Sequence, residues 1–156
     1  MDGVVIELRG VPVAKGRPRF AMRGAGQRPI AYTPGKTRNY ESDLRFAAQQ
    51  AMNGRPLFTG ALVLRLTASL PIPQSWSKKK QREAAAGVIM PTKKPDLDNF
   101  IKTCDSLGGV VFVDDSQIVT TVAEKVYSAN PALRIEIAPL TSGHPLPVVE
   151  IAEAIE

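Results

Sequence analysis

The segment from Ala61 to Leu70 places the strongest constraint on what this chain can fold into. Its apolar residues alternate with other residues, at Leu62, Leu64, Leu66 and Ala68. Because side chains along a strand point alternately to two faces, this pattern predicts a half-buried strand, which Pro71 ends. Such a strand has to be covered on one face, and 156 residues are enough for one core but too few for two. We therefore expect a single domain.

Other segments predict the elements that accompany this strand. Further strands are expected at residues 4–8, 118–127 and 133–137. Helices are expected from Thr37 to Gly54, from Ser75 or Ser77 to Gly87, and from about Asp98 to Leu107, where apolar residues recur at helical spacing. Residues 16–34 are rich in Gly, Arg and Pro and predict a hairpin or a mobile loop. Together these elements predict an α+β domain.

The charges are segregated along the chain. Residues 1–94 hold 17 Lys and Arg residues against 5 Asp and Glu, whereas residues 95–156 hold 3 against 10. No acidic residue lies between Arg9 and Tyr40, and a second basic run, Lys78-Lys79-Lys80 with Arg82, follows later. A basic surface of this density attracts a polyanion such as nucleic acid through counterion release. The alternative is a solvated basic face without a partner.

Composition also excludes several classes of protein. One cysteine, Cys104, and one histidine, His144, cannot form an intrachain disulfide or a zinc site. No apolar run reaches the roughly 18 residues that a membrane span needs, and the N-terminus lacks the features of a signal peptide. We therefore expect a cytoplasmic protein.

The acidic half contains one informative stretch, which begins at Lys94. Pro95 disfavours helical backbone at Lys94, so Asp96 is expected in extended or turn backbone and Asp98 is expected to cap the next helix. On a helical wheel Asp98, Lys102 and Asp105 share one face. The opposite face is apolar and comprises Phe100, Ile101, Cys104 and Leu107. The helix is therefore expected to be amphipathic, with an acidic polar face.

A second acidic pair, Asp114 and Asp115, follows the apolar residues 110–113 and is expected at the end of a strand. From there its carboxylates could converge with those near the start of the preceding helix. Carboxylates are ligands that Mg²⁺ prefers, and bound Mg²⁺ can supply both a nucleophilic water and charge stabilisation for phosphodiester hydrolysis. An acidic cluster within a basic protein fits that chemistry. Taken singly, each aspartate has a simpler interpretation as a helix cap, a solvated helix residue or part of a turn.

Three sequence motifs resemble one known family. The run Lys94-Pro95-Asp96-x-Asp98-Asn99-x-x-Lys102, followed by Asp114-Asp115-x-Gln117, resembles the central motif of the RusA family of Holliday-junction resolvases. Gly10-x-Pro12-x-x-Lys15-x-Arg17-Pro18-Arg19 is similar to the opening motif of that family, and Ser75-Trp76-Ser77-Lys78-Lys79-Lys80 to its middle basic segment. The matches occur in the same order and span about residues 10–127.

The resemblance carries several implications. It implies a small mixed β-sheet flanked by helices, an intertwined homodimer, and Mg²⁺-dependent resolution of four-way DNA junctions by paired symmetric nicks in recombination and repair. The metal ligands implied are Asp96, Asp98 and Asp115, with Asp114 as a supporting acid and Lys102 near the scissile phosphate. The basic residues expected to contact DNA are Lys15, Arg17, Arg19, Lys78, Lys79 and Lys80. The nuclease domain is expected at residues 1–138, with residues 139–156 as a peripheral, Pro-rich tail.

Several residues keep two interpretations. Trp76 could stack on a base or pack under the basic helix, and Lys102 could simply pair with Asp98 or Asp105. Cys104 is expected in the core, and His144 on the surface. For the whole chain three hypotheses remain, namely a junction-resolving nuclease, a related metal-dependent nuclease with another DNA target, and a non-enzymatic nucleic-acid-binding protein. The last predicts that the aspartates are dispensable and that binding is insensitive to Mg²⁺.

Overall fold

The computed structural model describes residues 3–21, 24–26, 28–32 and 34–140 of the chain. His144 and most of the predicted tail lie outside the described residues. The strands are β1 (Val4–Arg9), β2 (Arg19–Ala21), β3 (Ile30–Tyr32), β4 (Leu62–Pro71), β5 (Ile118–Ser128) and β6 (Ala132–Pro139). The helices are α1 (Gly35–Met52), α2 (Lys78–Ala85) and α3 (Leu97–Lys102), with the short 3-10 helices η1 (Thr103–Leu107) and η2 (Asp115–Gln117). The α+β prediction is confirmed.

The larger sheet is four-stranded and mixed, in the order β1-β6-β4-β5. β6 pairs antiparallel with both β1 and β4, whereas β4 pairs parallel with β5. The parallel pair requires a crossover, and α2, α3 and the two short 3-10 helices lie in that connection. β2 and β3 form a separate antiparallel hairpin, as one of the two alternatives for residues 16–34 predicted.

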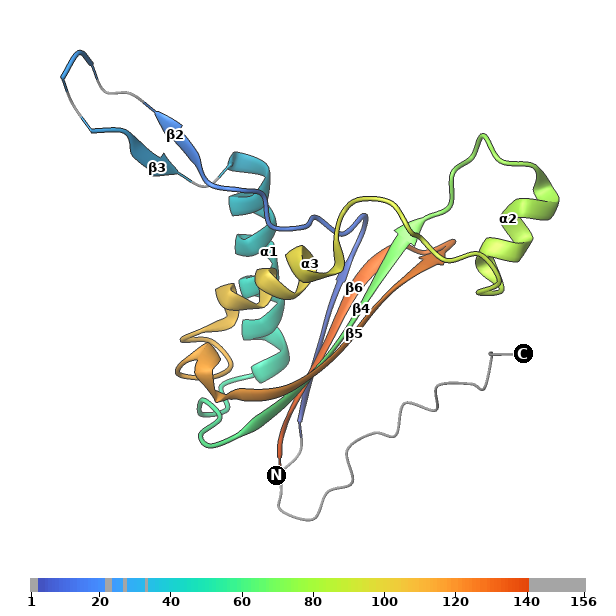
Figure 1. The fold of residues 1–156 in the computed structure, drawn as a ribbon. Helices are drawn as coiled ribbons and strands as arrows, with labels where there is room; N and C mark the ends of the chain where they lie inside the picture. Colours follow the sequence, from blue (N-terminus) through green and yellow to red (C-terminus); the bar gives the residue numbers. More distant parts are fainter. Residues whose placement is uncertain (1–2, 22–23, 27, 33, 141–156) are drawn as a thin grey trace.

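The core lies on one face of this sheet. The alternating residues of β4 are buried as predicted, and Leu64 and Leu66 stand beside Ile137 and Ile135 of β6. α1 packs against β1 and η1, and α3 lies beside it on the same side of the sheet (Figure 1). The opposite face carries polar side chains such as Arg65, and in the described part of the chain no helix covers it.

The start of α1 differs from the prediction in a way that matters for the site. The sequence offered Thr37 as the cap that starts this helix, but the helix begins at Gly35 with Pro34 as its N-cap, so that interpretation of Thr37 is wrong. Instead, the buried Thr37 hydroxyl accepts a hydrogen bond of 3.0 Å from the main-chain N–H of Gly16. Because this bond links two segments 21 residues apart, it fixes the basic N-terminal segment against α1.

The basic helix α2 is built as expected from its sequence. The Ser77 hydroxyl caps it by accepting a hydrogen bond of 3.2 Å from the Lys80 N–H. Trp76 packs edge-on against Tyr127 of β5, with 5.4 Å between ring centroids, and the Lys80 ammonium lies 4.0 Å from the Trp76 ring centroid. In Figure 1, α2 projects on the opposite side of α3 from the β2–β3 hairpin. No helix in the described ranges is both long and apolar enough to cross a membrane.

Candidate active site

Asp96 occupies the entrance to α3. Its backbone is extended (φ −70°, ψ 145°), as Pro95 predicted, and it is the N-cap residue of the helix. Asp98 lies in the first helical turn, so its predicted capping role is wrong. The N-cap therefore lies two residues earlier than expected, at Asp96. Neither carboxylate is engaged as a side-chain cap here, and both side chains are exposed.

The amphipathic face predicted for residues 98–107 is present, although the segment is α-helical only to Lys102 and 3-10 helical beyond it. Phe100, Cys104 and Leu107 are buried in the core. Lys102 lies 3.5 Å from Asp98 along the exposed face, which is the simple pairing that its spacing allowed.

The second acidic pair is held in place by Gln117. Its side-chain oxygen accepts hydrogen bonds from the N–H groups of Val113 (2.9 Å) and Asp114 (3.0 Å). Its amide nitrogen donates to the carbonyls of Phe58 (3.0 Å) and Gly60 (3.1 Å). The Gln117 side chain therefore attaches the turn that contains Asp114 to the segment just before β4. This contact gives Gln117, a residue of the matched motif, a structural role.

Like charges crowd at this turn. A hydrogen bond between the two neighbouring carboxyl groups lowers the pKa of Asp114 and raises the pKa of Asp115. The negative charge of Asp105 raises the pKa of Asp115 further. The structure therefore brings Asp105, Asp114 and Asp115 within electrostatic reach of one another, across the contact between η1 and η2.

Lys15 connects the basic N-terminal segment to this acidic region. Its ammonium lies 3.7 Å from Asp105 and 3.6 Å from Glu41 of α1. Its main-chain N–H donates to the carbonyl of Asn99 in α3 at 2.9 Å. Lys15 is therefore held between α1 and α3, in addition to lying on the basic surface predicted for DNA.

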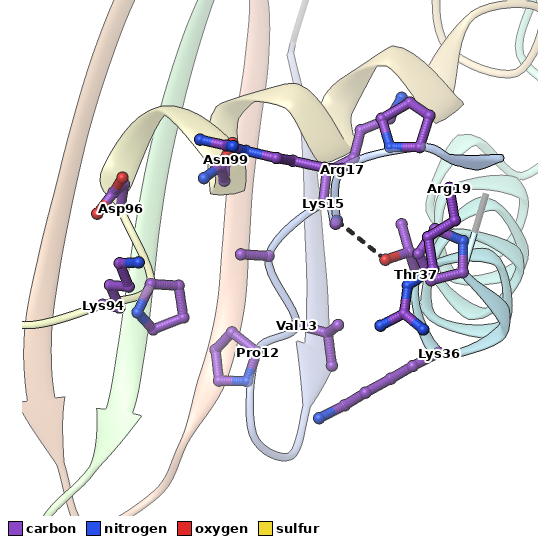
Figure 2. Close-up of a pocket in the computed structure, with 15 residues that line it drawn as sticks. Pro12, Val13, Lys15, Arg17, Arg19, Lys36, Thr37, Lys94, Asp96 and Asn99 are labelled. Atoms are coloured by element: carbon purple, nitrogen blue, oxygen red, sulfur yellow. Dashed lines mark hydrogen bonds between the residues drawn. The ribbon is translucent and has the colours of Figure 1, made fainter. Parts of the chain in front are cut away.

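A cleft of about 780 Å³ opens beside the start of α3. The charged and polar residues that line it are Lys15, Arg17, Arg19, Lys36, Thr37, Lys94, Asp96 and Asn99. Figure 2 shows Lys94 and Asp96 on one side of the cleft and Arg19 and Lys36 on the other. An acidic residue thus shares a wall with cations in a cleft that is otherwise strongly basic.

The predicted site residues do not all meet. Asp96 lines the cleft and Asp98, in the first turn of α3, does not, whereas Asp115 lies in the cluster with Asp105 and Asp114. Within the described residues, no group of three or more His, Cys, Asp or Glu side chains is arranged to hold a metal ion. The available donors are nevertheless exposed carboxylates, the chemistry that suits a hard divalent cation.

The middle basic segment lies apart from the cleft. Lys78, Lys79 and Lys80 are exposed on α2 and are not among the residues that line it. α3 lies between α2 and the β2–β3 hairpin in Figure 1, so basic elements flank the helix that carries Asp96 and Asp98.

Comparison with known proteins decides the family. The family model for endodeoxyribonuclease RusA matches residues 9–138. The chain belongs to the RusA endodeoxyribonuclease family. It is also 34% identical over 142 residues to the uncharacterised protein YqaN of Bacillus subtilis (strain 168), an alignment that covers 88% of this chain and 96% of that relative. Membership of the RusA family implies a hydrolase of DNA phosphodiester bonds, and nucleases of this family generally use a divalent metal.

Three residues of this RusA-family site, Glu41, Lys125 and Asn99, were given no role by sequence reasoning. Glu41 is an isolated acid on α1 whose sequence context gives no sign of its contact with Lys15. Lys125 of β5 donates hydrogen bonds of 3.0 Å to the carbonyls of both Lys93 and Pro95. Asn99 stands in the matched motif but was assigned no role, and it lines the cleft beside Asp96. That motif was the one signal that could have identified it.

Proposed function

We propose that this chain is a Mg²⁺-dependent endodeoxyribonuclease that binds four-way DNA junctions and resolves them by paired symmetric nicks in DNA recombination and repair. The observation that carries the proposal is the position of Asp96 in the wall of a cleft lined by Lys15, Arg17 and Arg19. Basic walls attract the phosphate backbone, and the acid at the start of α3 offers a metal ligand beside it. We assign this activity to residues 1–138, with residues 139–156 peripheral.

Asp96, Asp98 and Asp115 would hold the metal, with Asp114 supporting Asp115. Bound Mg²⁺ would supply charge stabilisation on the scissile phosphate and would lower the pKa of a nucleophilic water. Mg²⁺ is usually bound through one or two carboxylates together with substrate phosphates and waters. The acids lie in two places, with Asp96 in the cleft and Asp115 in the neighbouring cluster. This arrangement is compatible with the usual coordination of Mg²⁺, because a DNA phosphate can complete the set of ligands.

The basic residues would position the DNA. Arg17 and Arg19 in the cleft and Lys78, Lys79 and Lys80 on α2 would hold the phosphate backbone on either side of α3. Lys102 is exposed beside Asp98, so its flexible side chain can leave that surface pair and approach the scissile phosphate.

We propose that the working unit is a symmetric homodimer. A four-way junction has approximate twofold symmetry, so two related cuts need two equivalent acidic sites, and one chain has the aspartates for one. The apolar strands β4 and β5 are the candidates for its interface. β4 is interior to the sheet and can contribute only its uncovered face, whereas β5 is an edge strand. An edge strand of 11 residues with exposed Val119 offers pairing groups to a second copy.

Cleavage of a four-way junction beside a linear duplex of the same sequence tests the function. With Mg²⁺ present, we expect two symmetric nicks in the junction, at a rate well above that on the duplex, and no cleavage when EDTA replaces the metal. Equal cleavage of both substrates would instead favour a nuclease with another DNA target. If the protein bound the junction tightly but did not cleave it with any divalent metal, a non-enzymatic binding protein would be favoured.

A further inference from the structure

We infer that the β2–β3 hairpin contacts DNA bases, with the ring of Phe20 stacking on unpaired bases at the branch point of a bound junction. The inference rests on the proposed function, because it assumes that DNA occupies the basic cleft. It adds a base-contacting surface, whereas the cleft residues contact the phosphate backbone.

The hairpin exposes large apolar side chains. Phe20 is 71% exposed, Tyr32 is 46% exposed and Ile30 is 37% exposed. An aromatic ring that remains in water does not gain the favourable free energy of burial. An exposed phenylalanine on a basic element therefore needs an explanation. A base offers a flat π surface of similar size, and stacking on it requires no particular sequence.

The strand register leaves the Phe20 ring free for such contact. Phe20 stands opposite Ala31, whose methyl group cannot cover an aromatic ring. Arg19 and Tyr32 form the neighbouring pair and point to the other face of the hairpin. The ring is therefore accessible over its face, and an arginine stands next to it along the strand.

The hairpin also stands apart from the rest of the described structure. The main contacts of β2 and β3 are with each other, and Figure 1 shows the hairpin projecting from the end of α1 away from the sheet. An isolated two-stranded hairpin is marginally stable in water, and a ligand that covers its apolar residues would stabilise it. The charge of the segment indicates what that ligand is.

Every charged residue between Arg9 and Tyr40 is basic, which favours a polyanion over an apolar protein surface. Arg17 and Arg19, at the base of the hairpin, line the same cleft as Asp96. DNA whose backbone follows the cleft therefore reaches the hairpin. Basic side chains interleaved with exposed aromatics are typical of surfaces that hold unpaired nucleotides.

The test compares Phe20→Ala with Phe20→Tyr, which keeps a stacking ring, and with Phe46→Ala as a matched control. Phe46 is 63% exposed on α1 and does not line the cleft. Binding is measured in EDTA to a four-way junction, to a duplex and to a single-stranded dT oligonucleotide. A second junction carries 2-aminopurine at the branch point, whose fluorescence reports changes in base stacking.

We expect Phe20→Ala to weaken binding to the junction and to the dT strand by about 5-fold to 100-fold, and to the duplex by less than about twofold. It should also abolish the 2-aminopurine response. Phe20→Tyr should retain both, and Phe46→Ala should match the wild type. Equal effects on all three DNAs, or none, would overturn the inference. So would dissociation of a dimer by Phe20→Ala in sedimentation, because the ring would then contact a second copy. The binding assays need no cleavage, so a failure of the proposed nuclease function would be seen separately.

Discussion

The ammonium group of Lys125 in β5 holds the main-chain carbonyl of Pro95, one residue before Asp96. The same group binds the carbonyl of Lys93, also at 3.0 Å. Two of its three protons are therefore used to fix the loop that leads into α3, across 30 residues of sequence. A loop held at two points orients the carboxylate that follows it, so Lys125 is a positioning residue for Asp96.

Replacing Lys125 with Met should loosen this loop and weaken the proposed metal site. Residues that orient metal ligands from behind typically change metal affinity by about 10-fold to 100-fold. We expect the Mg²⁺ concentration for half-maximal cleavage, and Mn²⁺ affinity measured by calorimetry, to shift by about that factor. Lys125→Arg should restore part of the loss because it keeps the charge and the donors. An unchanged metal dependence in the Met variant would show that the loop needs no such anchor.

Asp98→Asn should separate chemistry from stability. The substitution removes a proposed metal ligand, so Mg²⁺-dependent nicking should fall by at least about 100-fold. Asp98 is a first-turn residue whose 66% exposed side chain makes a surface pair with Lys102, so unfolding free energy should fall by less than about 1 kcal/mol. Junction binding in EDTA should persist or tighten.

Asp43→Asn provides the matched control for this loss of charge. Asp43 is an exposed carboxylate of α1 that is not proposed to bind metal, and its variant should cleave like the wild type. Comparable activity of Asp98→Asn and Asp43→Asn would place the metal elsewhere.

The cleft arginines should govern the salt dependence of binding. On duplex DNA, each phosphate that the protein no longer neutralises lowers the slope of log K against log salt by about 0.9. Arg17→Ala with Arg19→Ala should therefore flatten the slope by up to about two units, and adding Lys15→Ala by up to about three. Lys15 is already paired with Glu41 and Asp105, so of the three residues it should contribute least to the salt slope.

Arg134→Ala is the control for this series. Arg134 forms a 2.7 Å ion pair with Glu136 on β6, away from the cleft, and its removal should leave the slope unchanged. A slope that responds to Arg134 but not to Arg17 would place the DNA on the uncovered face of the sheet.

The sequence predicted elements whose pattern is local and missed contacts that the fold creates. β4 could be predicted because alternation of Leu and other residues depends only on the strand itself. The burial of Phe100 and Cys104 could be predicted in the same way, because their helical spacing places them on one apolar face. The pairing of Lys15 with Glu41 and of Lys125 with Pro95 joins segments 26 and 30 residues apart, and no local pattern encodes either one. The start of α3 was misplaced because both Asp96 and Asp98 are residues that can cap a helix.

Cys104 should be unreactive in the folded protein. Burial raises the pKa of its thiol from the ordinary value of 9.0 to about 12, so the thiolate is disfavoured in the fold. A disulfide reagent at about pH 8 should react with one thiol per chain only after unfolding. Because the folded pKa lies above the unfolded one, the stabilisation is complete below pH 9.0 and is lost as the pH rises towards 12. Stability of the wild type should therefore fall more steeply over this range than that of Cys104→Ala, and rapid labelling of the native protein would contradict this placement.

The proposed homodimer predicts a specific defect in mixed assemblies. If each chain cuts one strand, a dimer of one wild-type and one Asp98→Asn chain should nick one strand of the junction and then stall. Mixing wild-type chains with an excess of the variant should therefore accumulate singly nicked junctions, in a proportion that follows the statistical abundance of the mixed dimer. Each strand is labelled separately to follow its own nick, and sedimentation at the working concentration establishes the assembly. Two results together would exclude the dimer: a monomer in sedimentation, and nicks on the two strands that stay uncorrelated at every mixing ratio. In that case two independent chains would be cutting the junction one strand at a time.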